Sequence, residues 1–301
     1  ARTGLKGGRR QAGQRHDHGF GRPVGVEELR RREGRADTLQ VFAGQGFAAG
    51  DAQAYRQVLV VAGQPLRQLL RHEAGLADYG ELPDYHHAVA RHDTPWPEED
   101  LLRRLDAGKL RYQPGAGWRY SNLGYLYVAR LIEQLTDLSL EDALAERAFA
   151  PIGLGRVRLA RTRADSEDVV TGIAPGYDAG WVYHGLLVGP LSDAALFLDR
   201  VMMGQLLPET LLREMRARRI VGGPIQGRPW ESPGYGLGLM VGTVESGMTL
   251  YGHTGAGPDS VVAIYRSAHD AAATTCAVFH EGCDQGLVEA KAVEQLLAAR
   301  S

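Results

Sequence analysis

The sequence predicts an α+β fold, in which an antiparallel sheet is flanked by helices and a mainly helical region is inserted. The first observation is a run of four strand-like segments near the C-terminus, separated by short polar turns. The second is a series of helical patterns through the middle of the chain, and the third is a closing amphipathic helix at residues 287–299. Helices and strands segregated in this way favour an α+β fold over a doubly wound sheet.

Length and composition are those of a globular protein with a sizeable core. The 301 residues suffice for one large domain or two interleaved ones, with 44% apolar and 23% charged residues. A formal net charge of −2 argues against nucleic acid or an anionic membrane surface as the main partner. No apolar run approaches about 18 residues, so we expect no membrane span.

The compartment and the oligomeric state stay unknown. The first residues are basic but lack the apolar segment of a signal peptide, and there is no initiator Met. A cytoplasmic location and export with the signal peptide already absent both fit this start. Two cysteines, Cys276 and Cys283, are too few for a disulfide framework.

Residues 1–63 differ in composition from the rest of the chain. They are rich in Arg and Gly, contain no serine and show weak periodicity, whereas the local signals agree with each other from Gln64 onward. We therefore expect an atypical segment over residues 1–63 that completes the sheet, followed by a domain over residues 64–301. Within this domain, the helical region reaches to about residue 215, and the sheet with the C-terminal helix covers about 216–301.

Polar and acidic residues mark the starts of the predicted helices. Pro97 is followed by three acids, which suit the positive end of a helix dipole. Asn122 can cap the next helix, and Ser139, with Asp142 three residues on, can cap a third. Ser192 opens a further apolar helix. The helix after Asn122 has an apolar stripe made of Leu123, Leu126, Tyr127, Leu131 and Leu135.

The four strand-like segments cover residues 237–244, 248–252, 260–266 and 273–280. Turns such as Glu245-Ser246-Gly247 separate them at the spacing of an antiparallel meander.

Two short motifs point to chemistry. A glycine-rich turn at residues 114–118 delivers Tyr120-Ser121-Asn122 to the start of an amphipathic helix. A tyrosine held in this way can act as a general base, and Asn122 can orient a substrate. Far downstream, His253-Thr254-Gly255 is the candidate facing partner. The structural alternatives are that Tyr120 packs the turn onto Trp118 and that His253 is a strand-end histidine.

Four segments, in this order, resemble the serine β-lactamase-like superfamily, which includes class C β-lactamases, penicillin-binding DD-peptidases and family VIII esterases. Residues 66–76 (LRQLLRHEAGL) resemble its RQLLSHTSGL segment, and residues 114–122 its PGxxWxYSN motif. Residues 235–239 resemble the strand before its third motif, and residues 252–257 the GHTG form of that motif. The resemblance covers about residues 64–300.

The resemblance implies a serine hydrolase that transfers an acyl group from an ester, amide or small peptide to water through an acyl-enzyme. Tyr120 would be the general base or proton shuttle, its phenol acidified by a neighbouring cation. Asn122 would bind a substrate amide or carbonyl. The segment His253-Thr254-Gly255 would lie on an edge strand facing the substrate, with backbone N–H groups in an oxyanion hole. Neither a cofactor nor a metal is implied.

The nucleophile that the resemblance implies is not identifiable. The family uses the Ser of a Ser-x-x-Lys motif upstream of the RQLL segment, on a helix expected within residues 1–63, where there is no serine. The only lysines are Lys6, Lys109 and Lys291, and none follows a serine by three.

Three explanations remain open for the missing nucleophile. Residues 1–63 do not give the true sequence, because of a frameshift or misassignment; or the chain is a catalytically silent member that binds a small molecule or peptide in the same pocket; or another residue is the nucleophile. Only Ser121 and Ser260 lie close to the motifs, and there is no Gly-x-Ser-x-Gly elbow.

The histidine in the third motif bears on the substrate. A lysine there would supply a permanent cation for a substrate carboxylate, whereas neutral imidazole supplies only hydrogen bonds at pH 7. We therefore expect esters, amides or small peptides before penicillins. The pairs His16–His18 and His86-His87 lack a second ligand cluster, so we interpret them as solvated surface and expect no metal.

Overall fold

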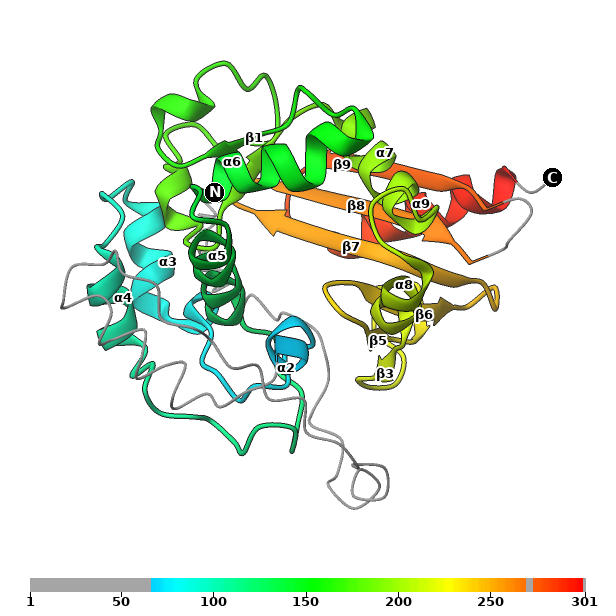
Figure 1. Ribbon diagram of the computed structural model, residues 1–301, viewed down its shortest axis with the longest axis horizontal. Helices are drawn as coiled ribbons and strands as arrows, with labels where there is room; N and C mark the ends of the chain where they lie inside the picture. The colour runs from blue at the N-terminus through cyan, green and yellow to red at the C-terminus, as the bar shows by residue number, and fades with distance from the viewer. Residues whose placement is uncertain (1–65, 269–272, 300–301) are drawn as a thin grey trace, which may run out of the picture.

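The computed structural model of the protein describes residues 66–268 and 273–299. Within these ranges, a seven-stranded antiparallel sheet lies beside a mainly helical region (Figure 1). The strands follow the order β3-β5-β6-β7-β8-β9, and β4 pairs with β6. The α+β prediction is therefore confirmed. The predicted segment at 1–63 lies outside the described residues.

The large sheet is built from seven strands, and a second sheet of two short strands lies within the helical region. The large sheet contains β3 (Arg219–Ile220), β4 (Trp230–Ser232), β5 (Gly234–Tyr235), β6 (Met240–Val244), β7 (Thr249–Gly257), β8 (Ser260–Ser267) and β9 (Thr275–Glu281). The small sheet pairs β1 (Arg158–Ala160) with β2 (Leu186–Val188).

The predicted meander corresponds to β6–β9, with two changes in length. Strand β6 starts at Met240 and not at residue 237, because Gly238 has a φ of +73° and forms the turn after β5. Strand β7 continues to Gly257, well past the predicted end at 252. Pairing with β8 overrides the low strand propensity of its glycines, so the His-Thr-Gly motif lies within the strand.

Eight α-helices lie in the described part of the chain. They are α2 (Leu66–Leu70), α3 (Pro83–Ala90), α4 (Glu98–Arg104), α5 (Asn122–Thr136), α6 (Leu140–Leu144), α7 (Leu191–Met202), α8 (Glu209–Arg216) and α9 (Gln285–Ala298). None of these helices has the length and apolar character needed to cross a membrane.

The helix caps correct some of the predicted starts. Ser121, and not Asn122, caps α5, because the Ser121 hydroxyl accepts a hydrogen bond from the Gly124 N–H at 3.1 Å. Ser139 caps α6 as predicted. Helix α7 begins at Leu191, one residue before the predicted Ser192. The apolar stripe of α5 is shorter than expected, since Leu135 is 64% exposed.

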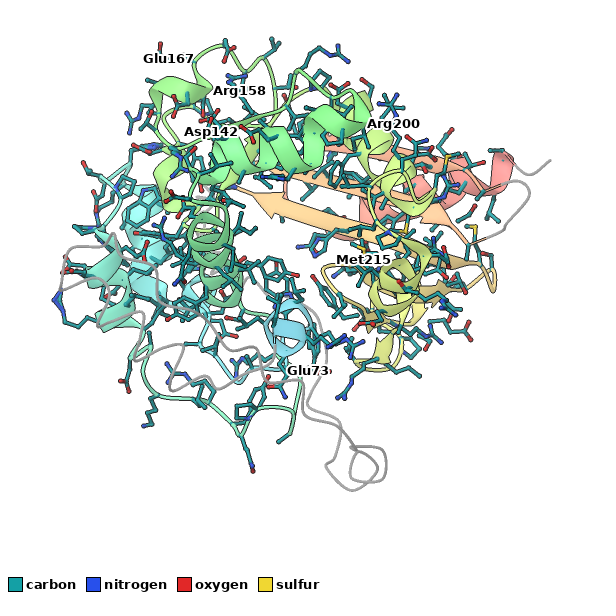
Figure 2. The ribbon with its side chains drawn as sticks, viewed as in Figure 1. Glu73, Asp142, Arg158, Glu167, Arg200 and Met215 are labelled. Atoms are coloured by element: carbon teal, nitrogen blue, oxygen red, sulfur yellow. The ribbon has the colours of Figure 1, made fainter. Side chains whose placement is uncertain are left out.

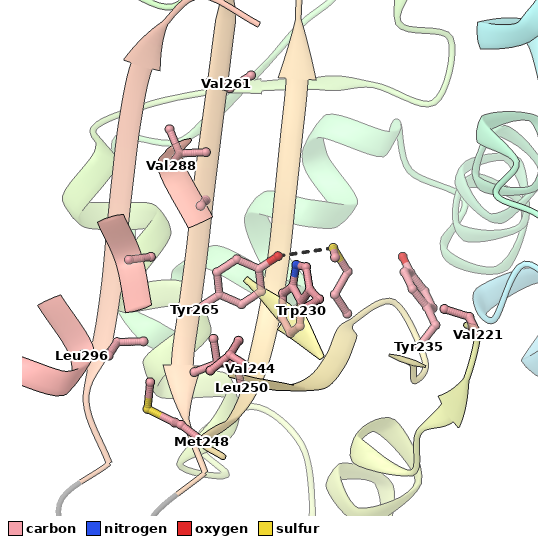
Figure 3. Packing of buried hydrophobic residues seen from close by; sticks show 13 residues of the cluster. Val221, Trp230, Tyr235, Val244, Met248, Leu250, Val261, Tyr265, Val288 and Leu296 are labelled. Atoms are coloured by element: carbon pink, nitrogen blue, oxygen red, sulfur yellow. Dashed lines mark hydrogen bonds between the residues drawn. The ribbon is translucent and has the colours of Figure 1, made fainter. Parts of the chain in front are cut away.

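Helices cover both faces of the sheet. On one face, the β8 residues Val261, Ala263 and Tyr265 pack against α9 (Figure 3). On the other face, Ile264 packs against α7 and α8, where Met215 is labelled in Figure 2. Neighbouring strand residues point to opposite faces, so this alternation decides which part of the protein each β7 side chain meets.

The helical region is joined to the sheet through the backbone of α2. The Leu70 carbonyl accepts hydrogen bonds from the Tyr125 hydroxyl of α5 at 3.0 Å and from the Gly238 N–H at 3.1 Å. An ion pair between Glu73 and Arg219 of β3 adds a second link, with N···O at 3.0 Å. The end of α2 is therefore fixed to both halves of the site described below.

Gly252 sets how closely β7 approaches β8. A Cβ atom added there would lie 1.9 Å from the Ile264 carbonyl oxygen. We expect Gly252→Ala to lower the free energy of unfolding by about 1–3 kcal/mol, because β7 and β8 would have to move apart to admit the methyl group. Urea denaturation measures this, with Gly223→Ala as control, since its added Cβ meets nothing within 4 Å. Equal losses in the two variants would contradict the prediction.

Candidate active site

The fold brings the two predicted motifs together. Tyr120 precedes α5 in the helical region and His253 lies on β7, yet their ring centroids are 6.4 Å apart. Both side chains are partly exposed. The candidate site thus lies between the start of α5 and the middle of β7, at the junction of the two halves of the protein.

The segment of β7 from His253 to Gly257 is a local sheet edge. Strand β6 pairs with β7 only over residues 249–252, whereas β8 pairs with it as far as Gly257. No other described strand pairs with this segment on the β6 side. The expected edge is therefore present beside Tyr120, although β7 as a whole is an inner strand.

Only part of the His-Thr-Gly segment faces Tyr120, which corrects the expectation for Thr254. Because the strand alternates, the Thr254 side chain points to the opposite face and is buried beneath the sheet. Its hydroxyl donates to Oε1 of Glu289 on α9 at 2.5 Å and accepts from the Tyr265 hydroxyl at 2.6 Å. The Thr254 side chain therefore joins β7 to α9 on the buried face of the sheet and cannot contact a ligand on the face of Tyr120.

Glu289 is the centre of a buried polar network that sequence reasoning missed. Its carboxylate is 1% exposed and is bound by two guanidinium N–H groups of Arg228, one of them at 2.7 Å. A buried carboxylate is tolerated only when it is paired and hydrogen-bonded, as it is here. The sequence carried no signal for this network, because α9 reads as an ordinary amphipathic helix.

Both ring nitrogens of His253 are engaged by the protein. Nδ1 lies 2.8 Å from the Thr254 carbonyl oxygen, which can only accept, so Nδ1 carries the proton. Nε2 of the neutral ring then accepts from the Tyr235 hydroxyl at 3.0 Å. Burial lowers the pKa of His253, which keeps the ring neutral near pH 7. The His253 ring therefore lines the site as an uncharged group and provides no positive charge for a ligand.

The surroundings of Tyr120 correct the expectation of an acidified phenol. Burial raises the pKa of Tyr120 well above its usual value, and Tyr125 and Asp78 raise it further. None of these influences comes from a cation. Within the described residues, Tyr120 is a neutral phenol that can donate or accept a hydrogen bond.

His72, in the segment after α2, is a site residue that the sequence reasoning did not single out. Its ring is 2% exposed and lies 4.2 Å from the Tyr120 ring and 4.7 Å from the Tyr235 ring, centroid to centroid. Its Nδ1 accepts from the Ser121 N–H at 3.1 Å. The backbone of His72 is left-handed, with φ +59°, which is uncommon for a residue with a side chain. His72 thus fixes the turn that carries Tyr120.

Asn122 is turned mainly toward Asp78. The Asn122 backbone N–H donates to Asp78 Oδ1 at 2.9 Å, and its side-chain amide lies 3.4 Å from Oδ2. No described residue binds the Asn122 side-chain oxygen, so this oxygen is the part of Asn122 that remains for a ligand. A role for Asn122 in substrate binding stays a prediction.

The described residues do not supply an obvious nucleophile or metal site. Ser121 is 3% exposed, and its hydroxyl donates to the Ala77 carbonyl at 2.6 Å while it caps α5. It is a structural residue and cannot be freed without losing the cap. No group of three His, Cys, Asp or Glu residues that could hold a metal occurs in the searched ranges.

Removing the Thr254 hydroxyl tests the network below β7. We expect Thr254→Val to lower the free energy of unfolding by about 1.5–3 kcal/mol, because a hydrogen bond to a buried carboxylate is lost. Thr254→Ser keeps the hydroxyl and should lose clearly less. Urea denaturation at pH 7 compares the three proteins. A Val variant as stable as the Ser variant would show that the hydroxyl contributes nothing.

Acid should destabilise the protein through three histidines, His72, His184 and His253, which are buried or half-buried. Burial lowers the pKa of His72 and His253, and lowers that of His184 to about 4. The unfolded chain therefore binds more protons below pH 6.5, and stability falls as the pH drops from 6.5 toward 4. The melting temperature of His184→Gln should depend less on pH over this range, whereas exposed His87→Gln should follow the parent. Parallel pH profiles for all three proteins would refute the linkage.

Similar sequences are found among hydrolases and penicillin-binding proteins. The chain is 30% identical over 204 residues to a D-aminopeptidase from Brucella anthropi, covering 64% of this chain and 37% of the relative. It is 31% identical over 126 residues to a penicillin-binding protein from Bacillus subtilis, covering 40% of this chain and 26% of the relative. The chain thus spans little more than a third of the length of the D-aminopeptidase.

Similar solved structures share the fold. A D-stereospecific amidohydrolase from Streptomyces sp. has a TM-score of 0.66 at 22% identity, covering 83% of this chain and 82% of that chain. The D-amino acid amidase from Ochrobactrum anthropi SV3, complexed with D-phenylalanine, has a TM-score of 0.64 at 20% identity, covering 83% and 76%.

The family match includes both motifs of the candidate site. A beta-lactamase family model matches residues 61–288, which contain the Tyr120 and His253 segments, and residues 1–60 lie outside the match. More than half of the chain is covered. The chain therefore belongs to the beta-lactamase family.

Proposed function

We propose that the protein hydrolyses small amides or short peptides by acyl transfer, and that the acyl residue has the D configuration. The observation that carries this proposal is the placement of the Tyr120 phenol beside His253, where no other described strand covers the edge of β7. A hydrolase function is supported by the family and by the relatives. The D configuration is proposed because similar proteins are named as a D-aminopeptidase and a D-stereospecific amidohydrolase. These names describe the similar proteins.

The proposed role of Tyr120 is that of a proton shuttle. Since its phenol is neutral, it can pass its own proton to the leaving nitrogen while it accepts the proton of the attacking hydroxyl. Acting instead as a standing phenolate base would require a cation that the described residues do not supply. The attacking hydroxyl and the backbone N–H groups of the oxyanion hole remain parts of this proposal.

A neutral site favours substrates without a carboxylate next to the reacting carbonyl. His253 is held neutral, and both its nitrogens are bound by the protein. A penicillin carboxylate would find no positive charge on this wall. An amide or ester group needs only hydrogen bonds, which the free edge of β7 and the side-chain oxygen of Asn122 can provide.

A catalytically silent binding protein is the second candidate. It is favoured by one specific observation: no serine in the sequence is followed by a lysine three residues later. Such a protein would retain the wall formed by Tyr120 and His253 and bind an amide or peptide there without turnover.

Turnover and covalent labelling separate the two candidates. D-alanine p-nitroanilide, its L enantiomer and p-nitrophenyl acetate are offered to the protein, and a fluorophosphonate probe is added to label an active serine. An active enzyme should release nitroaniline faster from the D substrate, and peptide mapping should identify the labelled serine. Neither hydrolysis above buffer nor labelling, in protein whose intact mass matches its gene, would reject the enzyme.

Tyr120→Phe tests the shuttle. Loss of the phenolic hydroxyl should lower kcat/KM about 100-fold, because proton transfer to the leaving group is removed while the ring still packs on His72. Tyr127→Phe is the matched control, since its buried hydroxyl on α5 has no hydrogen-bond partner among the described residues. An unchanged rate in Tyr120→Phe would remove Tyr120 from the mechanism.

A further inference from the structure

We propose that His184 is a substrate-binding residue, whose Nε2–H donates a hydrogen bond to a carbonyl oxygen of the substrate. This inference rests on the proposed function and adds a specificity-determining residue to the same site. Three histidines, His72, His184 and His253, lie at or near the site and differ in the hydrogen-bond donors they offer.

Two of the three histidines have no accessible donor. His253 donates its Nδ1–H to the Thr254 carbonyl, and its Nε2 accepts from the Tyr235 hydroxyl. His72 accepts at Nδ1, so its proton is on Nε2, but that atom is buried and has no partner among the described residues. A ligand at the surface of the site therefore cannot reach an N–H group on either ring.

The third histidine, His184, is held in the opposite tautomer to His253. The Tyr79 hydroxyl lies 2.6 Å from Nδ1 of His184. Tyr79 is 3% exposed, and its hydroxyl has no other described acceptor, so it donates to Nδ1. The proton of the neutral His184 ring is therefore on Nε2. The side chain is partly exposed, and no described residue binds Nε2.

His184 is held near the start of α5 through its partner Tyr79. The segment just before it is tied down twice, because the Trp181 indole N–H donates to the Asp93 carbonyl at 3.1 Å and the Tyr183 hydroxyl to the Trp96 carbonyl at 2.9 Å. Its partner Tyr79 directly follows Asp78, which binds Asn122 at the start of α5.

The chemistry of the donor defines what it recognises. A neutral N–H group on a rigid ring pairs with an oxygen acceptor, such as the carbonyl of an amide, and gains little from an ammonium group. A positioned donor discriminates strongly against an analogue that lacks the acceptor. The amide carbonyl, or a carbonyl in the acyl residue, is the matching group.

Substitutions at His184 test the donor. His184→Phe keeps the ring shape and removes the N–H, whereas His184→Gln keeps an N–H donor on a chain of similar reach. With D-phenylalanine p-nitroanilide, we expect KM to rise about 3- to 10-fold in the Phe variant, with kcat changed less, and to recover largely in the Gln variant. His92→Phe is the control, since His92 binds the Gly176 carbonyl at an exposed position.

Binding without turnover is tested with two ligands. Calorimetry compares D-phenylalanine amide with its reduced diamine, which lacks the carbonyl. His184→Phe should weaken the amide about 3- to 10-fold and leave the diamine unchanged, whether or not the protein is an enzyme. Equal weakening of both ligands, or of neither, would overturn the role of His184.

The tautomer can be tested without any ligand. Nitrogen-15 NMR should show a protonated Nε2 and an unprotonated Nδ1 on His184, and Tyr79→Phe should disturb this state. A proton on Nδ1 would overturn the proposal by itself. If wild-type protein shows the expected tautomer but neither hydrolyses nor binds the amides, the proposed function fails, and the substrate contact of His184 fails with it.

Discussion

A buried carboxylate under strand β7 constrains much of this structure. Glu289 has to be paired where it lies, and Arg228, Thr254 and Tyr265 all direct hydrogen-bonding groups to it or to each other. These residues come from α9, β7, β8 and the loop before β4. Since breaking a buried pair costs far more than the pair contributes, the network holds the four segments together. The edge of β7 is thereby rigid before any ligand arrives.

The opposite wall depends on an aromatic cluster instead of charge. His72 lies between Tyr120, Tyr125 and Tyr235, and so contacts the turn before α5, α5 itself and the sheet. Its left-handed backbone is retained because the ring and Nδ1 are held from several sides. The site therefore combines one side fixed by ionic hydrogen bonds with another fixed by closely packed aromatic rings, and neither side presents a charge to a ligand.

Local patterns in the sequence predicted the helices and strands better than they predicted the contacts of individual side chains. Strands β6–β9 and helix α9 follow from alternation and turn residues, and the Tyr120 and His253 motifs were paired correctly through the resemblance. The cap of α5 was misassigned because Ser121 and Asn122 are both good capping residues, and only the tertiary contacts of Ser121 decide between them. The Tyr79–His184 pair was unpredictable, because it joins residues 105 positions apart that carry no motif.

The register of β7 determines the character of the site. It is fixed at one end by Gly252, which admits no side chain against β8, and at the other by the tight turn at Pro258-Asp259. Inserting or deleting one residue between these points would exchange the two faces of the strand. An imidazole would then meet the Glu289 carboxylate in the core, and a threonine hydroxyl would face Tyr120. The length of this strand is therefore as important to the site as the identity of its residues.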